Sequence, residues 1–126
     1  GFAVLTQSTS ITQNSTTAVS STLYIPAGSE IIDFNIDVLT AFNSATSATL
    51  TIGTAAAGTQ YVSGVDVKTA TGRIAPTFTA AQLAAMNGVT VTGTAAPTTA
   101  PVVVTVTPSG ATSAGYVVVT VIYAQQ

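Results

Sequence analysis

Apolar residues alternate with small polar residues along most of this chain, the period-two pattern of strands that bury one face. Thr and Val are abundant, and Gly and Pro separate the alternating runs. The pattern predicts strands at residues 2–7, 18–25, 30–40, 48–54, 60–65, 72–78, 89–93, 102–107 and 116–124. Short strands at this spacing predict an all-β chain that folds as one jelly-roll-like β-sandwich domain over residues 1–126.

The clearest strand, residues 30–40, is predicted to have one buried and one wet face. The buried side chains are expected to be Ile32, Phe34, Ile36 and Val38, and the opposite ones Asp33, Asn35, Asp37 and Leu39. Pro26, Ala27 and Gly28 predict a turn before it, so strands 18–25 and 30–40 form either a hairpin or a pair that crosses between sheets. In the strand at 48–54, Gly53 predicts a bulge or a close backbone approach.

The last strand, residues 116–124, has apolar side chains on both faces, which predicts a central strand or one in a subunit interface. Residues 79–86 instead predict one short helix that connects strands across one end of the sandwich. Thr79 and Gln82 have the spacing of a capping box, and Asn87-Gly88 is a stop signal. Residues 94–101 and 108–114 are expected to be loops because of their prolines and Gly110.

Charge is scarce in this chain. Only 5% of residues are charged, against about 25% in ordinary proteins. With one Lys and one Arg the chain lacks the basic cluster that nucleic acid requires, and no apolar run is long enough to span a membrane. It has no Cys for a disulfide framework, which fits assembly in a reducing compartment. Because 47% of the residues are hydrophobic and few charges repel one another, the composition favours self-assembly.

The carboxylates do not predict a metal or catalytic site. Asp33-x-Asn35-x-Asp37 resembles the start of a calcium loop, but Val38 stands where the loop needs Gly and Ser44 where it needs Glu. Strand alternation explains the spacing, and it puts Asp33 and Asp37 roughly 13 Å apart, too far for a glycosidase pair. With no His there is no Ser-His pair. The sequence predicts no enzyme, and no catalytic, cofactor-binding or metal residues.

Two further groups of residues have a functional and a structural interpretation. Asp66, Lys68 and Arg73 could be a binding determinant, but an ion pair that fixes a local loop is the simpler interpretation. The tyrosines could stack on a sugar, but most lie within predicted strands, where half-buried packing with a wet hydroxyl is expected. They are Tyr24, Tyr61, Tyr116 and Tyr123.

Residues 36–74 read IDVLTAFNSATSATLTIGTAAAGTQYVSGVDVKTATGRI. This stretch, with a strand that ends in TAFN, then ATLTIGT, a Gly/Ala-rich loop and YVSGVDVKTATGRI, resembles a segment of small virion proteins of tailed bacteriophages. The resemblance implies a β-sandwich or jelly-roll module that decorates or cements an icosahedral head, often as a trimer at local three-fold positions.

The sequence therefore leads to the hypothesis of a capsid cement or decoration protein on the outer surface of a phage head, assembled in the host cytoplasm. Its expected partners are the major capsid protein and itself, as a homotrimer, with no nucleic acid, membrane or cofactor. One alternative is a carbohydrate- or host-surface-binding module of a head fibre or tail tip, which would need exposed aromatics in a cleft. A second is a pilus or surface-layer subunit, which would normally begin with an export signal.

Overall fold

The computed structural model describes residues 3–13, 15–88 and 99–125. It contains eight strands and one helix, in the order β1 (Ala3–Thr12), β2 (Val19–Pro26), β3 (Glu30–Thr40), β4 (Ser47–Gly53), β5 (Val62–Asp66), β6 (Gly72–Ile74), α1 (Ala80–Met86), β7 (Thr99–Ser109) and β8 (Tyr116–Gln125). The strand predicted at residues 89–93 lies outside the described residues.

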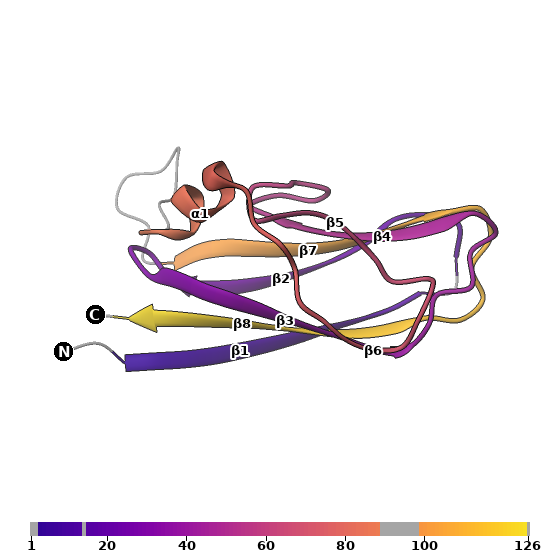
Figure 1. Ribbon diagram of the computed structural model, residues 1–126, viewed down its shortest axis with the longest axis horizontal. Coiled ribbons are helices and arrows are strands. Elements are labelled where there is room, and N and C mark those ends of the chain that lie inside the picture. Colours follow the sequence, from indigo (N-terminus) through magenta and orange to yellow (C-terminus); the bar gives the residue numbers. More distant parts are fainter. Residues whose placement is uncertain (1–2, 14, 89–98, 126) are drawn as a thin grey trace.

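The strands form two four-stranded antiparallel sheets that pack face to face (Figure 1). We call them sheet A, with the order β1-β8-β3-β6, and sheet B, with the order β2-β7-β4-β5. In this arrangement the first half of the chain pairs with the second half in reverse: β1 with β8, β2 with β7, β3 with β6 and β4 with β5. Eight strands paired in this way form a jelly roll, so the predicted β-sandwich is confirmed.

The predicted turn at residues 26–28 joins strands of different sheets. Ser29 donates its backbone N–H to the Pro26 carbonyl at 3.1 Å, and Gly28 has a φ of +83°, a conformation that favours glycine. Since β2 belongs to sheet B and β3 to sheet A, the two strands do not pair. Of the two predicted arrangements, the structure has the crossing between sheets.

The facing of β3 departs from simple alternation at its start. Ile31 pairs with Tyr123 and Asp33 with Ile122, which leaves Ile32 without a partner at a β-bulge. The bulge turns Ile31 into the core, at 3% exposure, and leaves Ile32 49% exposed. The prediction that Ile32 is buried is therefore wrong, because the extra residue shifts the alternation by one. The predicted burial of Phe34, Ile36 and Val38 is confirmed.

Strand β7 is longer than predicted and contains both Pro101 and Pro108, which the sequence placed in loops. Strand β2 pairs with β7 from Thr99 to Val106, whereas β4 pairs with it from Val103 to Ser109. Each proline therefore lies where β7 has a neighbour on only one side. A residue without an N–H is tolerated in such a position, although it is excluded from the middle of a fully paired strand.

Two other strand ends differ from the sequence prediction. Strand β1 continues to Thr12, beyond the predicted end at residue 7, because every residue from Ala3 to Thr12 has a partner on β8. Strand β6 ends at Ile74, before the predicted residue 78, and Pro76 follows it without a backbone donor. Pairing with β8 therefore decides the end of β1, whereas a local proline follows the end of β6.

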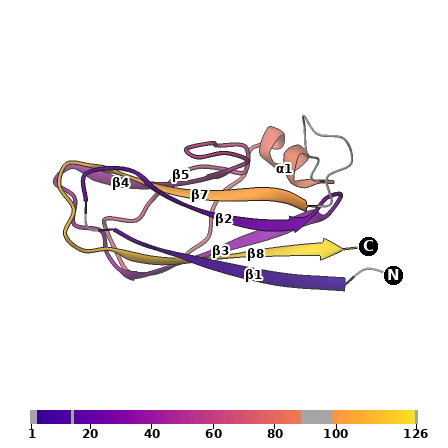
Figure 2. The ribbon, with the colours of Figure 1, turned by 180° about the vertical axis from the view of Figure 1, so that it is seen from behind.

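The predicted helix is present as α1, and its capping box is confirmed. Thr79 accepts a bond from the Gln82 backbone N–H at 3.2 Å, and the Gln82 side chain accepts one from the Thr79 backbone N–H at 2.9 Å. The Gln82 amide also donates to the Thr59 carbonyl at 3.3 Å, and Met86 is 2% exposed. The helix thereby closes one end of the sandwich (Figures 1 and 2).

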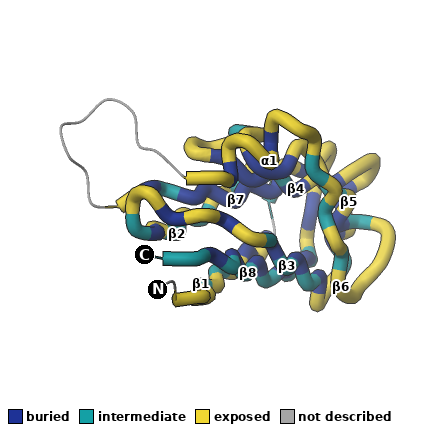
Figure 3. The backbone as a smooth tube through the Cα atoms, turned by 60° about the vertical axis from the view of Figure 1, so that its left-hand side comes forward, coloured by how far each residue is buried: buried dark blue, intermediate teal, exposed yellow. Residues whose placement is uncertain are grey.

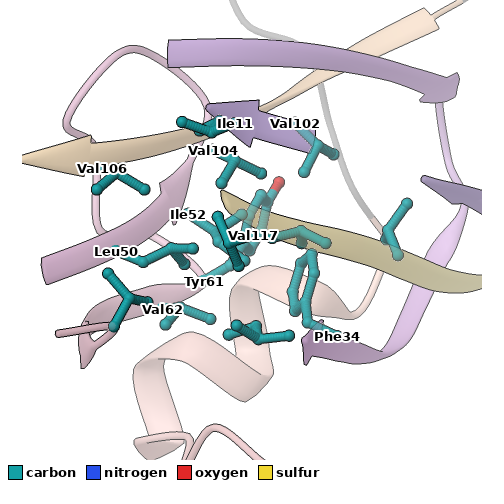
Figure 4. Packing of buried hydrophobic residues seen from close by; sticks show 14 of the residues in the cluster. Ile11, Phe34, Leu50, Ile52, Tyr61, Val62, Val102, Val104, Val106 and Val117 are labelled. Atoms are coloured by element: carbon teal, nitrogen blue, oxygen red, sulfur yellow. The ribbon is translucent and has the colours of Figure 1, made fainter. Parts of the chain in front are cut away.

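The core fills the space between the sheets (Figures 3 and 4). Sheet A contributes Ile31, Phe34, Ile36, Val38, Val117, Val119, Val121 and Tyr123, and sheet B contributes Ala48, Leu50, Ile52, Val62, Val102, Val104 and Val106. Phe34 lies near the centre, with its ring 6.0 Å from that of Tyr61 and 6.4 Å from that of Phe78. The space between the two sheets is therefore filled by packed side chains.

Candidate interaction surface

The same five residues, VVVTV, occur in the two central strands, at 102–106 of β7 and 117–121 of β8. In both copies the first, third and fifth valines point into the core and are at most 1% exposed. The second and fourth residues point outward, as Val103 and Thr105 on sheet B and as Val118 and Thr120 on sheet A. The surroundings of these four outward residues distinguish the two faces of the molecule.

The outward side of β7 is covered by the loop at residues 54–60, which we call the covering loop. Thr105 is 1% exposed and Val103 is 7% exposed, although both lie on the outer face of sheet B. The Ala57 backbone N–H donates to the Thr105 hydroxyl at 2.9 Å, and the Ser20 hydroxyl lies 2.9 Å from the same oxygen. The covering loop thus closes the middle of this face.

The covering loop depends on two glycines that let it approach β4 closely. A Cβ atom on Gly53 would lie 2.6 Å from the carbonyl carbon of Gly58 and 2.2 Å from Oε1 of Gln60. That oxygen accepts a bond from the Thr54 backbone N–H at 3.1 Å. The close backbone approach that the sequence predicted at Gly53 is confirmed.

No loop among the described residues covers the outer face of sheet A, and we call it the open face. Its outward residues are Val4, Thr6, Ser8, Ser10 and Thr12 of β1; Tyr116, Val118, Thr120, Ile122 and Ala124 of β8; Glu30, Asp33, Asn35, Asp37 and Thr40 of β3; and Arg73 of β6. Those of β8 are all half-buried by their neighbours on β1 and β3. The prediction that β8 is central is confirmed; a subunit interface on this strand stays a prediction.

The open face combines small hydroxyl side chains with isolated apolar ones. Its charges, Glu30, Asp33, Asp37 and Arg73, follow β3 and β6, and Asp37 lies directly across from Arg73. On β1 and β8 the face is uncharged, and the hydroxyls of Ser8 and Thr120 lie 2.7 Å apart. Along β1 and β8 the open face therefore favours contacts through shape and apolar burial over long-range charge.

The Asp33, Asn35 and Asp37 side chains share this face, as the strand pattern predicted. Asp33 accepts a bond from the Phe34 backbone N–H at 2.8 Å, which occupies one of its oxygens locally. Within residues 3–13, 15–88 and 99–125 no three His, Cys, Asp or Glu side chains are close enough to hold a metal ion.

Asp66, Lys68 and Arg73 are not brought together as one cluster. Asp66 accepts bonds from the backbone N–H groups of Lys68 at 2.8 Å and Thr69 at 3.3 Å, and from the Thr69 hydroxyl. The Thr69 hydroxyl and the Lys68 N–H are the main reasons why the pKa of Asp66 lies below its ordinary value. Hydrogen bonds to the turn, more than an ion pair, therefore hold this loop, and Arg73 lies across from Asp37 instead.

The four tyrosines occupy three different environments. Tyr61 and Tyr123 are inside the sandwich, where burial raises the pKa of Tyr61 and the Tyr123 hydroxyl accepts a bond from the Gln7 amide at 3.0 Å. Tyr116 belongs to the open face, while Tyr24 is 58% exposed on the outer face of sheet B. They do not form an aromatic platform, and the predicted half-buried state fits only Tyr116.

One surface was missed by the sequence reasoning. Of the six exposed large hydrophobic residues among those described, five belong to β1, the end of β2, the start of β3 and α1: Val4, Leu5, Tyr24, Ile32 and Leu83. These elements meet at the end of the sandwich where the N and C labels lie (Figure 1). Ile32 could not be found in advance, because its exposure depends on the bulge.

Comparison of this chain with family models, with curated proteins and with solved structures finds no match. The one helix in the described part of the chain is too short to cross a membrane.

Proposed function

We propose that this chain is a structural virion protein, a cement or decoration protein that binds the outer surface of a phage head and stabilises it. The observation that carries the proposal is the eight-stranded jelly roll with one sheet face that no described loop covers and that is uncharged along β1 and β8. Jelly rolls are frequent in viral capsid proteins and in lectins. Because a fold alone does not fix a function, the proposal also draws on the chemistry of the open face.

The open face is suited to a broad contact with another protein surface. It combines isolated apolar side chains, Val118 and Ile122 among them, with hydroxyls that can bond to a partner's backbone. The resemblance of residues 36–74 to phage virion proteins covers β4 to β6 and the end of β3, which frame both the open face and the covering loop. The proposed partner is the major capsid protein.

The proposed mechanism is mechanical. A rigid homotrimer would present three weak patches at once, and after the first patch binds, the other two contacts become intramolecular. The trimer would then bridge neighbouring capsid subunits and oppose the pressure of packaged DNA. The lectin-like alternative has less support, because the tyrosines are dispersed and no aromatic platform forms among them.

The test adds purified protein to heads that lack it and measures occupancy by quantitative electron microscopy at low and high NaCl. We expect saturable attachment that changes less than tenfold with salt, and little between pH 6 and 8, because the chain has no His and only two cations. Ile122→Lys on the open face should weaken attachment at least tenfold. The matched control is Thr22→Lys, exposed on sheet B.

Absence of wild-type protein from the heads would contradict the proposal. Attachment to host cells or glycans instead would favour the host-surface-binding alternative, and location in a pilus or surface layer would favour the second alternative. A loss of affinity of tenfold or more with salt would show that the few charges dominate binding.

A further inference from the structure

The edge strands on the two sides of the sandwich differ in length, regularity and charge. On one side, β5 and β6 are only 5 and 3 residues long. Between Leu50–Val65 and Thr51–Ser63 the pairing of β4 with β5 shifts, so Gly64 is an extra residue at a bulge. Asp66 ends β5 and Arg73 is the middle residue of β6. Short length, a bulge and charge are the devices by which proteins prevent edge-to-edge association.

Strand β1, on the other side, has none of these devices. It is 10 residues long, pairs with β8 without a register shift, and contains neither a charged residue nor a proline. Val4 is 63% exposed and Leu5 is 39% exposed. Figure 3 shows β1 as the outermost strand of sheet A. No strand of residues 3–13, 15–88 or 99–125 pairs with its other edge, which we call the free edge and which is a row of backbone donors and acceptors available to another strand.

The neighbouring edge strand, β2, is less available. It ends at Pro26, and the Gln7 amide of β1 donates to its Tyr24 carbonyl at 2.9 Å. The Thr9 and Ser21 hydroxyls form a second bridge between the two strands. These bridges close the gap between the sheets on this side, while the outward edge of β1 stays free.

We propose that the free edge of β1 pairs antiparallel with β1 of a second copy of this chain, so that two copies of sheet A join into one continuous sheet. A second copy can pair with this edge because two copies bring no like charges together at the junction. The charges of sheet A lie on β3 and β6, and β8 separates them from β1, so they are about 10 Å from the junction, near one Debye length. No like charges face each other across it.

The sequence of β1 also selects a register. Residues opposite each other in an antiparallel pair share a face, so inward residues must meet inward residues. With Ser8 on the two-fold axis, Leu5 lies opposite Ile11 of the other copy, and Thr6 opposite Ser10. With the axis at Gln7 or Thr9, Leu5 would instead face the polar Thr9 or Gln13. Hydroxyl pairs such as Thr6 with Ser10 are themselves favourable across strands.

A two-fold contact joins copies in pairs. Alone it gives a dimer, and between the trimers proposed above it gives a hexamer when the two-fold axes cross the three-fold axis of each trimer. The inference does not rest on the capsid role, because it follows from the edge of β1. The mass of the particle in solution tests the pairing of β1 edges without any measurement of attachment to phage heads.

The first test measures that mass by light scattering on a size-exclusion column. The wild type should contain two or six chains. In the double variant Thr6→Lys with Ser10→Lys, each introduced lysine lies opposite a lysine of the other copy. The like charges should break the junction, and the mass should fall by half. Thr6→Lys with Ser10→Glu places opposite charges in the same positions and should restore it. Unfolding curves confirm that both variants fold, which is expected because both side chains are exposed.

The second test uses a cross-link, because the chain has no cysteine. Ser8→Cys should give a disulfide-linked dimer on mild oxidation, since the two-fold axis brings the Cβ atoms to roughly 5 Å. The matched control is Ser63→Cys on β5, also exposed, which should stay reduced. A wild-type monomer or trimer together with equal cross-linking of both variants would overturn the inference. This result would not bear on the capsid proposal, which is tested by attachment to phage heads.

Discussion

Strands β7 and β8 contain the same five residues in the same structural role, yet their outward side chains have different surroundings. Val103 and Thr105 of β7 are 7% and 1% exposed beneath the covering loop. Val118 and Thr120 of β8 are half-buried on the open face, which no loop in the described part of the chain covers. The difference shows that a strand with apolar residues on both faces need not lie in a subunit interface, because a loop of the same chain can cover it.

The covering loop therefore changes how the two faces should be interpreted. On sheet B it contributes a backbone donor to Thr105, so the hydroxyl is satisfied although it is buried. On sheet A the Thr120 hydroxyl meets a neighbouring serine instead and stays accessible. The outward residues of β7 are covered within the chain, whereas those of β8 stay half-exposed.

The largest expected effect contrasts the two sides of β8. Val119→Asp should abolish cooperative folding, because Val119 is 1% exposed and an unpaired buried carboxylate costs several kcal/mol. Val118→Asp, one residue away on the open face, should fold. Circular dichroism and urea unfolding of both variants measure this. Equal tolerance of the two changes would contradict the assigned facing of β8.

The second effect concerns the covering loop. Gly53→Ala should destabilise the protein by about 1 to 3 kcal/mol, because the added methyl group collides with the Gly58 backbone and forces the loop away from β4. Hydrogen exchange should then become faster at the Ala57 N–H. Ala56→Gly, an exposed change in the same loop, is the control and should cost less than about 1 kcal/mol. Similar exchange rates in both variants would show that the close approach does not hold the loop.

The third effect compares Val103 of β7 with Val118 of β8 by replacing each with threonine, which has nearly the same shape. Val103→Thr buries a hydroxyl beneath the covering loop and should cost about 1 to 3 kcal/mol of unfolding free energy. Val118→Thr places the same hydroxyl on the half-exposed open face and should cost less than about 0.5 kcal/mol. Urea unfolding of both variants gives the difference. If the two costs are the same, the covering loop does not exclude water from β7.

The smallest effect concerns a turn that an exposed side chain holds. The turn after β5 is held by Asp66, an exposed residue, so Asp66→Asn should change the unfolding free energy by less than about 0.5 kcal/mol at neutral pH. The pKa of Asp66 is lowered in the folded state, so its stabilising contribution is present above about pH 4 and is lost as the pH falls through that lowered pKa. The difference between variant and wild type should therefore shrink in acid. A difference that grows in acid would contradict this assignment.

Much of the fold could be predicted from local pattern. The bounds of β3 agree with the alternation of its residues, and the capping box of α1 needs only Thr79 and Gln82. The pattern failed where pairing with another strand decides the outcome. Pro101 and Pro108 marked loops by composition, but β7 accommodates them because its two neighbours cover different parts of it.

The candidate surface was less predictable than the fold. The sequence indicated that β8 is apolar on both faces and that charge is scarce, and both facts bear on the open face. It gave no indication that Ile32 is exposed, because the bulge that exposes it is a property of the pairing between β3 and β8. The free edge of β1 also depends on which strand is outermost in its sheet.

By itself the sequence determined which side of each regular strand is apolar, where the helix begins and how little charge the surface carries. These features follow from local backbone geometry and composition, which act over a few residues. Only the tertiary structure decided that the outward residues of β7 are covered and those of β8 are open. The reason is that burial of a side chain depends on segments far away in the sequence, here a loop some fifty residues before β7.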